Sequence, residues 1–383
     1  MDITASSRDT TMGIGHMGRS LVLPVSAILV CIGYFAPGVS FAVAVLPFAF
    51  AICTNDRITR FLWVAGYFGW VAAISCWGLW NLGYPAAAVI LAGILGTCLV
   101  ALLYAGMGVG LASFLLLPVH FIPGNPLLVA GTVLPGTGLQ GIIALVLIVI
   151  LVEGTSRAWL RAVILLLVLI LGNTWYDLTG LSRPEMTEGP RYQTLDIADL
   201  NAVTEYGYND ALERRMRSGR SYITGENLIR SDDAGTVARW CRRVRTRDIT
   251  VYLGVQDAET GQGQVWEFSD KTCPTPEITY AARTGIPGLT GGVWLMDGSQ
   301  SSLDPAFLAC FEAFSLWRWT EVLQLRPQTI VTIANDHWTE PLPVGRLRRK
   351  IGAQFERLIS VPVFHAEARK TMLVLMPAGR AKQ

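Results

Sequence analysis

The chain has 383 residues, of which 51% are hydrophobic and only 16% are charged. No Asp, Glu, Lys or Arg occurs in residues 61–152, a run that a soluble domain does not need and that the core of a bilayer requires. This distribution excludes a purely cytosolic globular enzyme. The formal net charge of +2 indicates no particular partner, and the abundant aromatic residues exclude a disordered chain.

Apolar runs separated by polar residues, glycine or proline predict about seven membrane crossings, give or take one. The first two runs are shorter than the ~20 residues of an ordinary span and could form a tight or tilted hairpin. A cleaved signal peptide would account for the first run alone, whereas the runs that follow it favour a polytopic membrane protein. The runs cover residues 20–35, 38–53, 61–80, 84–104, 106–121, 127–152 and 159–175.

Arginines flank these runs at three places, and short loops rich in Lys or Arg stay in the cytoplasm. With seven crossings they all fall on one side. The N-terminal segment 1–19 is therefore predicted to be cytoplasmic, the transmembrane domain to cover residues 20–176, and everything after Asp177 to lie outside. The flanking residues are Arg8, Arg19, Arg57, Arg60, Arg157 and Arg161.

A Pro- and Gly-rich linker at residues 177–190 precedes residues 191–383, which have the composition of a mixed globular domain. Because strand patterns alternate with helical ones, this domain is predicted to be α/β or a layered α+β sandwich. The strand patterns are at 221–224, 249–255, 264–268 and 328–333, and near Val361 and Met372. The helical patterns are at 206–217, 235–245, 305–319 and 344–358.

Familiar ligand motifs are missing or misplaced. The seven cysteines form no C-x-x-C pair, so neither a disulfide scaffold nor a zinc site is predicted. The glycines of 136–141 match G-x-G-x-x-G, but no soluble strand precedes them and no acidic residue follows about 20 positions on. No cofactor is therefore predicted. From residue 181 onward 25 basic residues face 24 acidic ones, which argues against a nucleic-acid partner.

One cysteine has surroundings suited to chemistry. Cys310 lies in Phe-Leu-Ala-Cys-Phe-Glu, where an apolar strand end could meet a helix whose dipole ionises the thiol. A buried structural cysteine is the alternative. Glu226 directly follows the strand pattern 221–224, Lys271 is the only lysine in the first 349 residues, and Asn335 follows another strand pattern. Carboxylate, ammonium and thiol near strand ends could perform acyl transfer, although Glu226 and Lys271 could also be ordinary structural charges.

These residues resemble the motifs of the carbon-nitrogen hydrolase (nitrilase) superfamily, and within it the membrane-embedded apolipoprotein N-acyltransferases. Cys310-Phe-Glu312 is similar to the family's C-Y-E, and Asn335-Asp-His-Trp to its N-D-x-W. Lys271-Thr-Cys-Pro-Thr-Pro resembles K-x-x-L-x-P, and Gly-Glu226-Asn stands where the family has P-E-[TS]. The two-part layout is most similar to the TraB-type conjugal-transfer proteins, a divergent branch of this family.

The resemblance implies a helical domain of about seven spans in the bacterial inner membrane, then a periplasmic α-β-β-α sandwich at 191–383. It implies that Glu226 takes the thiol proton, that Cys310 attacks an acyl carbonyl, and that Lys271 stabilises the oxyanion. Glu312 would orient the acceptor amine or the lysine, and Asn335 would bond backbone near the site. The implied partners are membrane lipid and a lipoprotein, a pilin or other conjugal-transfer proteins.

Two functions stay open at this point. One is an integral-membrane thiol acyltransferase or amidase, and the other is a non-catalytic membrane scaffold of a conjugation apparatus that keeps the nitrilase fold. Convergence of Glu226, Lys271 and Cys310 would favour the enzyme, and their separation would favour the scaffold.

Overall fold

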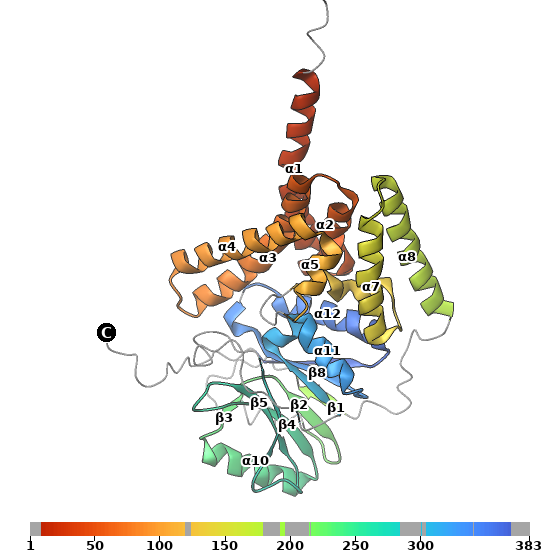
Figure 1. Ribbon diagram of the computed structural model, residues 1–383. Helices are drawn as coiled ribbons and strands as arrows, with labels where there is room; N and C mark the ends of the chain where they lie inside the picture. Colours follow the sequence, from red (N-terminus) through yellow and green to blue (C-terminus); the bar gives the residue numbers. More distant parts are fainter. Residues whose placement is uncertain are drawn as a thin grey trace, which may run out of the picture. The chain divides into compact units, whose positions relative to one another are not determined.

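A computed structural model describes residues 9–118, 124–178, 192–195, 214, 216–283, 300, 304–339 and 341–368 (Figure 1). Side chains are described from residue 19 onward, except at 192–195, 337–338 and 368. The chain divides into two compact units: unit 1 is Met1–Pro118 with Gly124–Thr179, and unit 2 is Val119–Pro123 with Gly180–Gln383. Most of the predicted linker and of the predicted helix at 206–217, and the predicted strand near Met372, lie outside the described residues.

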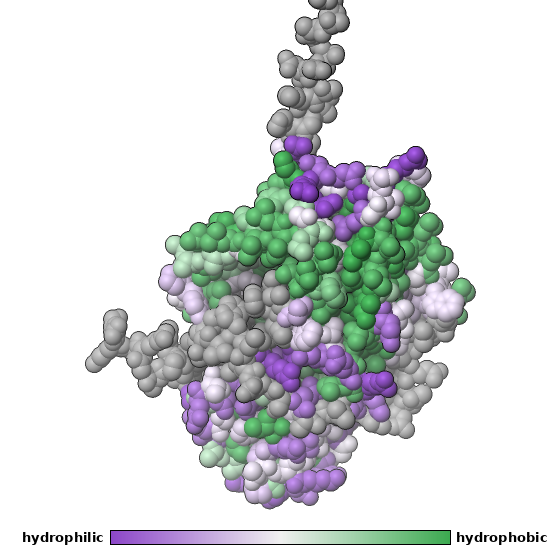
Figure 2. Space-filling view, viewed as in Figure 1, coloured by the Kyte–Doolittle hydropathy of each residue, from purple (hydrophilic) through white to green (hydrophobic). Residues whose placement is uncertain are grey.

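Unit 1, where described, consists of helices joined by short turns (Figure 1). Three of them, α3, α4 and α8, are long and apolar enough to cross a membrane. Leu95 and Leu99 of α4 are about 60% exposed, and Figure 2 shows hydrophobic residues over this surface. Lipid is the solvent that such a surface fits. The helices are α1 (Asp9–Phe35), α2 (Ala42–Cys53), α3 (Arg57–Asn81), α4 (Ala86–Met107), α5 (Val109–Leu115), η1 (Pro126–Val129), α6 (Ala130–Val133), α7 (Gly138–Glu153) and α8 (Ala158–Leu178).

The described helices provide fewer crossings than the predicted seven. They offer three by length and composition, or four if Pro126–Val133 and Gly138–Glu153, bent by 112°, count as one broken span. The predicted run 106–121 contains the seven-residue helix α5, which at 1.5 Å per residue reaches only about 10 Å. Glycine explains the break, because Gly108 between α4 and α5 has a φ of 89°. Apolar composition predicts the surroundings of a segment, whereas glycine and proline decide how long its helix is.

Three of the arginines that flank the apolar runs make contacts at one end of unit 1. Arg19 pairs with Asp56 at 3.3 Å, Arg60 donates to the Thr54 carbonyl at 3.2 Å, and Arg161 donates to the Ile52 carbonyl at 2.9 Å. All three contacts lie at or just after the C-terminus of α2, where backbone carbonyls lack helical partners. Figure 2 shows hydrophilic residues gathered at this end.

Unit 2 contains two sheets. In the first, strands β1, β2 and β4 are parallel, β5 and β6 are antiparallel to their neighbours, and β3 pairs with β4. The second is the parallel sheet β7-β8-β9. The strands are β1 (Tyr192–Leu195), β2 (Ser221–Thr224), β3 (Ile229–Arg230), β4 (Thr250–Gln256), β5 (Gly263–Phe268), β6 (Glu277–Ala281), β7 (Ala306–Ala309), β8 (Ile330–Asn335) and β9 (Val363–Ala368).

The two sheets pack face to face between helices. Ile223 and Val265 of the first sheet share a buried cluster with Phe307 and Val331 of the second. Helix α10 (Ala234–Arg247) covers the opposite face of the first sheet through Trp240. Helices α11 (Leu316–Gln324) and α12 (Val344–Ile359) cover the second sheet, and their Trp319 and Phe355 rings stack at 4.0 Å. The order of layers in unit 2 is therefore helix, sheet, sheet, helix.

The helix predicted at 305–319 is wrong at its start. Residues Ala306–Ala309 form the buried strand β7, a short 3-10 helix, η2 (Cys310–Phe314), follows, and α11 begins only at Leu316. A strand buried on both faces has a continuous apolar sequence, so periodicity cannot distinguish it from a buried helix. Cys310 therefore lies immediately after a strand and at the start of a short helix, as its apolar strand-end context predicts.

Candidate functional site

The candidate site lies where strands of both sheets end. Cys310 follows β7, Glu226 follows β2 after one glycine, and Asp336 follows β8. The Glu226 backbone N–H donates to the carbonyl of Ala334 near the end of β8 at 3.4 Å, which ties the end of β2 to the end of β8. Carboxyl ends of strands are a usual place for catalytic groups in α/β folds because the loops there can vary freely.

Cys310 occupies a strained turn. Its φ is 27°, a value that L-residues rarely adopt, and its side chain is buried with 7% exposed. The next turn of chain is fixed by Glu312, which is fully buried and paired with Arg318 at 3.2 Å. Glu312 also accepts a hydrogen bond from Tyr280 and one from the Arg283 N–H at 2.7 Å. Strain held by such surroundings is frequent at functional sites, where it aims a side chain.

The structure brings Glu226 and Cys310 together, because the Cys310 side chain donates a hydrogen bond to the Glu226 carboxylate. Glu226 is 8% exposed, and burial raises its pKa to about 8 from an ordinary value of 4.5. The Arg348 charge opposes this rise, while the Glu312 and Asp336 charges add to it. A carboxyl group with a pKa near neutrality can both take and return a proton at physiological pH.

Two glycines make room for Glu226 and for the turn that precedes it. A Cβ added at Gly254 of β4 would lie 2.1 Å from the Gly225 carbonyl oxygen, so β4 can pass the turn before Glu226 only without a side chain. A Cβ added at Gly263, the first residue of β5, would lie 2.4 Å from Glu226 Oε1. The first sheet therefore packs closely against the backbone of the Gly225–Glu226 turn at Gly254 and against the Glu226 carboxylate at Gly263.

The structure does not bring Lys271 to this pair. Lys271 is exposed and follows the far end of β5, whereas Glu226 lies against Gly263 at the start of that strand. The strand between them spans roughly 17 Å at 3.3–3.4 Å per residue. Glu312, predicted to orient an amine or the lysine, instead contacts Arg318. Asn335 is buried at the end of β8, in register with Ala368 of β9.

A cation that the sequence reasoning missed lies at the site. Arg348 of α12 is completely buried and forms two hydrogen bonds with Asp336. Its Cζ lies 5.8 Å from the centre of the Phe314 ring in η2. The sequence shows it only as one of several basic residues at 346–350, but helical spacing places it on the apolar face with Val344, Ile351 and Phe355. A single charge on a buried helix face is the signal that could have revealed it.

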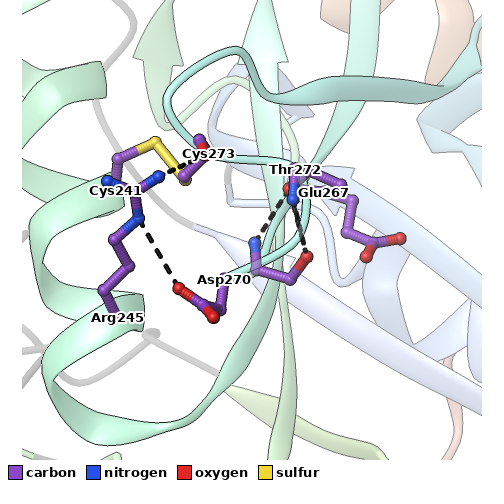
Figure 3. The surroundings of a disulfide bond; sticks show 7 residues. Cys241, Arg245, Glu267, Asp270, Thr272 and Cys273 are labelled. Atoms are coloured by element: carbon purple, nitrogen blue, oxygen red, sulfur yellow. Dashed lines mark hydrogen bonds and ion pairs between the residues drawn. A yellow bond between two sulfur atoms is a disulfide. The ribbon is translucent and has the colours of Figure 1, made fainter.

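Unit 2 also contains a disulfide that was not predicted. Cys241 of α10 is bonded to Cys273, 32 residues later, and Arg245 pairs with Asp270 beside it at 3.6 Å (Figure 3). No spacing motif marks the pair, because its cysteines meet only through packing of α10 on the first sheet. Cys310 is consequently the one cysteine of unit 2 that is not part of a disulfide.

The described residues contain no cluster of three or more His, Cys, Asp or Glu that could hold a metal ion. No protein-family model matches the chain. No curated protein matches it either.

Proposed function

We propose that the protein is a membrane-anchored acyltransferase or amidase of the nitrilase type, and that Cys310 is its nucleophile. The observation that carries the proposal is the hydrogen bond from the Cys310 side chain to a buried carboxylate, Glu226. The helix, sheet, sheet, helix order of unit 2 is consistent with the layers that the nitrilase resemblance implies, and in this way supports the proposal. A thiol paired with a base, both at strand ends, is the arrangement that nucleophilic catalysis needs.

The chemistry proceeds through a thioester. The Glu226 carboxylate takes the Cys310 proton, and the thiolate attacks the acyl carbonyl carbon. When the bond between that carbon and its leaving group breaks, Glu226 returns the proton to the departing oxygen or nitrogen. An amine or water then attacks the thioester and loses its proton to Glu226, which restores the Cys310 thiol and releases an amide or an acid.

Intact-protein mass spectrometry tests this step directly. Full-length protein, purified with native lipids, is compared with Cys310→Ala. We expect one added acyl group on the wild-type chain, removable by hydroxylamine, located at Cys310 by peptide analysis and absent from the variant. Peptide analysis is required because Cys98 of unit 1 is exposed and could carry an acyl group of its own. A wild-type protein that gains no acyl group and whose Cys310 resists thiol reagents would contradict the proposal.

The non-catalytic scaffold has one observation in its favour. Lys271, the cation of the resembled family, lies apart from Glu226 and Cys310. A scaffold needs no reactive thiol, so an inert Cys310 in a folded protein would support this second function.

We further propose that the protein resides in the bacterial inner membrane with its N-terminus in the cytoplasm and unit 2 outside. The meeting of Arg19, Arg60 and Arg161 at one end of unit 1 supports a cytoplasmic face there. The disulfide supports an oxidising compartment for unit 2. Labelling of a Ser218→Cys variant in intact cells tests this, since residue 218 is exposed. An impermeant maleimide should react with it in cells whose outer membrane is permeabilised, and reaction only after lysis would contradict the orientation.

The resemblance to apolipoprotein N-acyltransferases and TraB-type proteins suggests the two substrates of the proposed reaction. The acyl donor would be a membrane lipid, and the acceptor a lipoprotein or pilin of a conjugal-transfer apparatus. The helices of unit 1 that are long and apolar enough to cross a membrane support a lipid donor, because a chain anchored by such helices meets membrane lipids.

A further inference from the structure

Arg348 has an unusual position for a charged side chain. None of its surface is exposed, and a buried guanidinium destabilises a protein unless carboxylates and hydrogen bonds compensate for its lost hydration. The Asp336 carboxylate accepts two hydrogen bonds from the guanidinium, and the nearest Glu367 oxygen lies 3.8 Å away. Because Phe314 belongs to the same short helix as Cys310, the 5.8 Å contact with its ring places the guanidinium beside the turn that carries the thiol.

The other buried or half-buried cations of this region have local partners. Arg318 pairs with Glu312 and Glu321, and Arg349, which is 47% exposed, pairs with Glu367. Arg348 also has carboxylate partners, Asp336 and Glu367, but its charge in addition interacts with Glu226 and Cys310.

The Arg348 Nε atom is buried and has no hydrogen-bond partner. A buried donor left unpaired destabilises the fold, and a catalytic role is one explanation for keeping such a donor in a native structure. The developing negative charge of a reaction at Cys310 would supply that partner.

We propose that Arg348 is the cation of the Cys310 site, where it stabilises the thiolate in the place that the resemblance gives to Lys271. A catalytic purpose for Arg348 rests on the proposed function. Its effect on the ionisation of the Cys310 thiol does not, because that ionisation can be measured without any substrate. Charge interactions are reciprocal. Since the Cys310 charge favours the protonated guanidinium, the guanidinium must equally favour the Cys310 thiolate.

Other ionisable groups around the Cys310 thiol also affect its ionisation. Glu226 faces Cys310 from the turn after β2, and its carboxylate disfavours a second negative charge. Among the described residues, the neighbouring elements contribute further ionisable groups near the site: Glu312 of η2, Asp336 after β8, and Glu367 and His365 of β9. Removing Arg348 therefore leaves an excess of carboxylates beside the thiol.

The test is the pH dependence of Cys310 alkylation by iodoacetamide in the full-length protein in detergent. Peptide mass spectrometry isolates Cys310 from the cysteines of unit 1. We expect Arg348→Gln to raise the apparent pKa of Cys310 by at least one unit, which slows alkylation at pH 7 about tenfold. Arg348→Lys should recover part of this loss. Arg349→Gln, on the same helix and paired with Glu367, is the matched control and should leave the profile unchanged.

Two further variants keep the test decisive. If Arg348→Gln does not fold because Asp336 loses its partner, Arg348→Gln with Asp336→Asn removes both charges and is compared with Asp336→Asn alone. An unchanged profile in a folded protein, with the disulfide intact, would overturn the proposal. A shift on Lys271→Gln without one on Arg348→Gln would also overturn it. A missing acyl-enzyme together with a shifted Arg348→Gln profile would refute the enzymatic function and leave the role of Arg348 standing.

Discussion

Glu226 should make unit 2 less stable as the pH rises. Burial raises the pKa of Glu226 to about 8 from the ordinary 4.5, so the folded protein holds this proton more tightly than the unfolded chain does. The contribution to stability is therefore complete below about pH 4.5 and is lost progressively as the pH rises through 8. Above that range the folded state must hold a buried carboxylate charge.

Replacing Glu226 by glutamine removes this dependence while keeping the size of the side chain. One pKa unit corresponds to about 1.4 kcal/mol, so a shift from 4.5 to about 8 corresponds to at most about 5 kcal/mol. We expect the glutamine variant to gain stability over the wild type between pH 5 and about pH 8, with the difference levelling off above that range. Its advantage at pH 9 should be several kcal/mol larger than at pH 5.

Thermal proteolysis of the full-length protein in detergent can measure the difference. The temperature at which half of unit 2 is cleaved is recorded for both proteins across the pH range, and only their difference is interpreted, because other groups titrate equally in both. Glu277→Gln, at an exposed position at the start of β6, is the matched control and should show no such trend. A difference between wild type and Glu226→Gln that stays constant from pH 5 to pH 9 would refute the reasoning.

Two other substitutions test neighbouring parts of unit 2. Gly263→Ala should reduce acylation of Cys310 at least tenfold with little loss of stability, because the new methyl group would lie 2.4 Å from Glu226 Oε1 and displace the base; peptide mass spectrometry of the acylated protein checks this. Replacing both Cys241 and Cys273 by serine should lower the unfolding free energy by about 3–4 kcal/mol, since the bond closes a loop of about 32 residues. Thermal proteolysis measures that loss.

Each of these substitutions has a control. Gly235→Ala on α10 places its Cβ 3.5 Å from the nearest atom and should leave acylation unchanged. Normal acylation of Gly263→Ala would show that Glu226 is not held as described. Treatment of the wild type with a reductant should reproduce the loss of stability of the double serine variant, and equal stability of the oxidised and reduced proteins would contradict the estimate.

Much of unit 2 could be predicted from local patterns. The strand pattern 221–224 coincides with β2, and the patterns at 249–255, 235–245 and 344–358 differ from β4, α10 and α12 by no more than two residues at either end. These elements bury one stripe or one face, so their sequences carry a clear period. β7 carries no such period because Ala306–Ala309 is buried on both faces, and its sequence therefore predicts the start of a helix as readily as a strand.

The separation of Lys271 from Glu226 follows from the direction of strand β5. Glu226, Cys310 and Lys271 each follow a strand, and in an all-parallel sheet the ends of those strands would share one edge. β5 runs antiparallel to β4, so its C-terminal end, with Lys271 beyond it, lies at the opposite edge from Glu226. Strand direction depends on pairing with distant strands, and no local pattern encodes it.

Arginine has physical advantages as the cation of a fully buried thiol site. Burial lowers the pKa of a lysine readily and can discharge it, whereas an arginine stays protonated in proteins. The planar guanidinium can also bind Asp336 through two nitrogen atoms and keep its Nε–H for another partner. If Arg348 is this cation, its charge is constant over the accessible pH range. Cys310 reactivity should then rise with pH in transitions that belong to the Glu226 and Cys310 pair alone, without the decline at high pH that deprotonation of a lysine would cause.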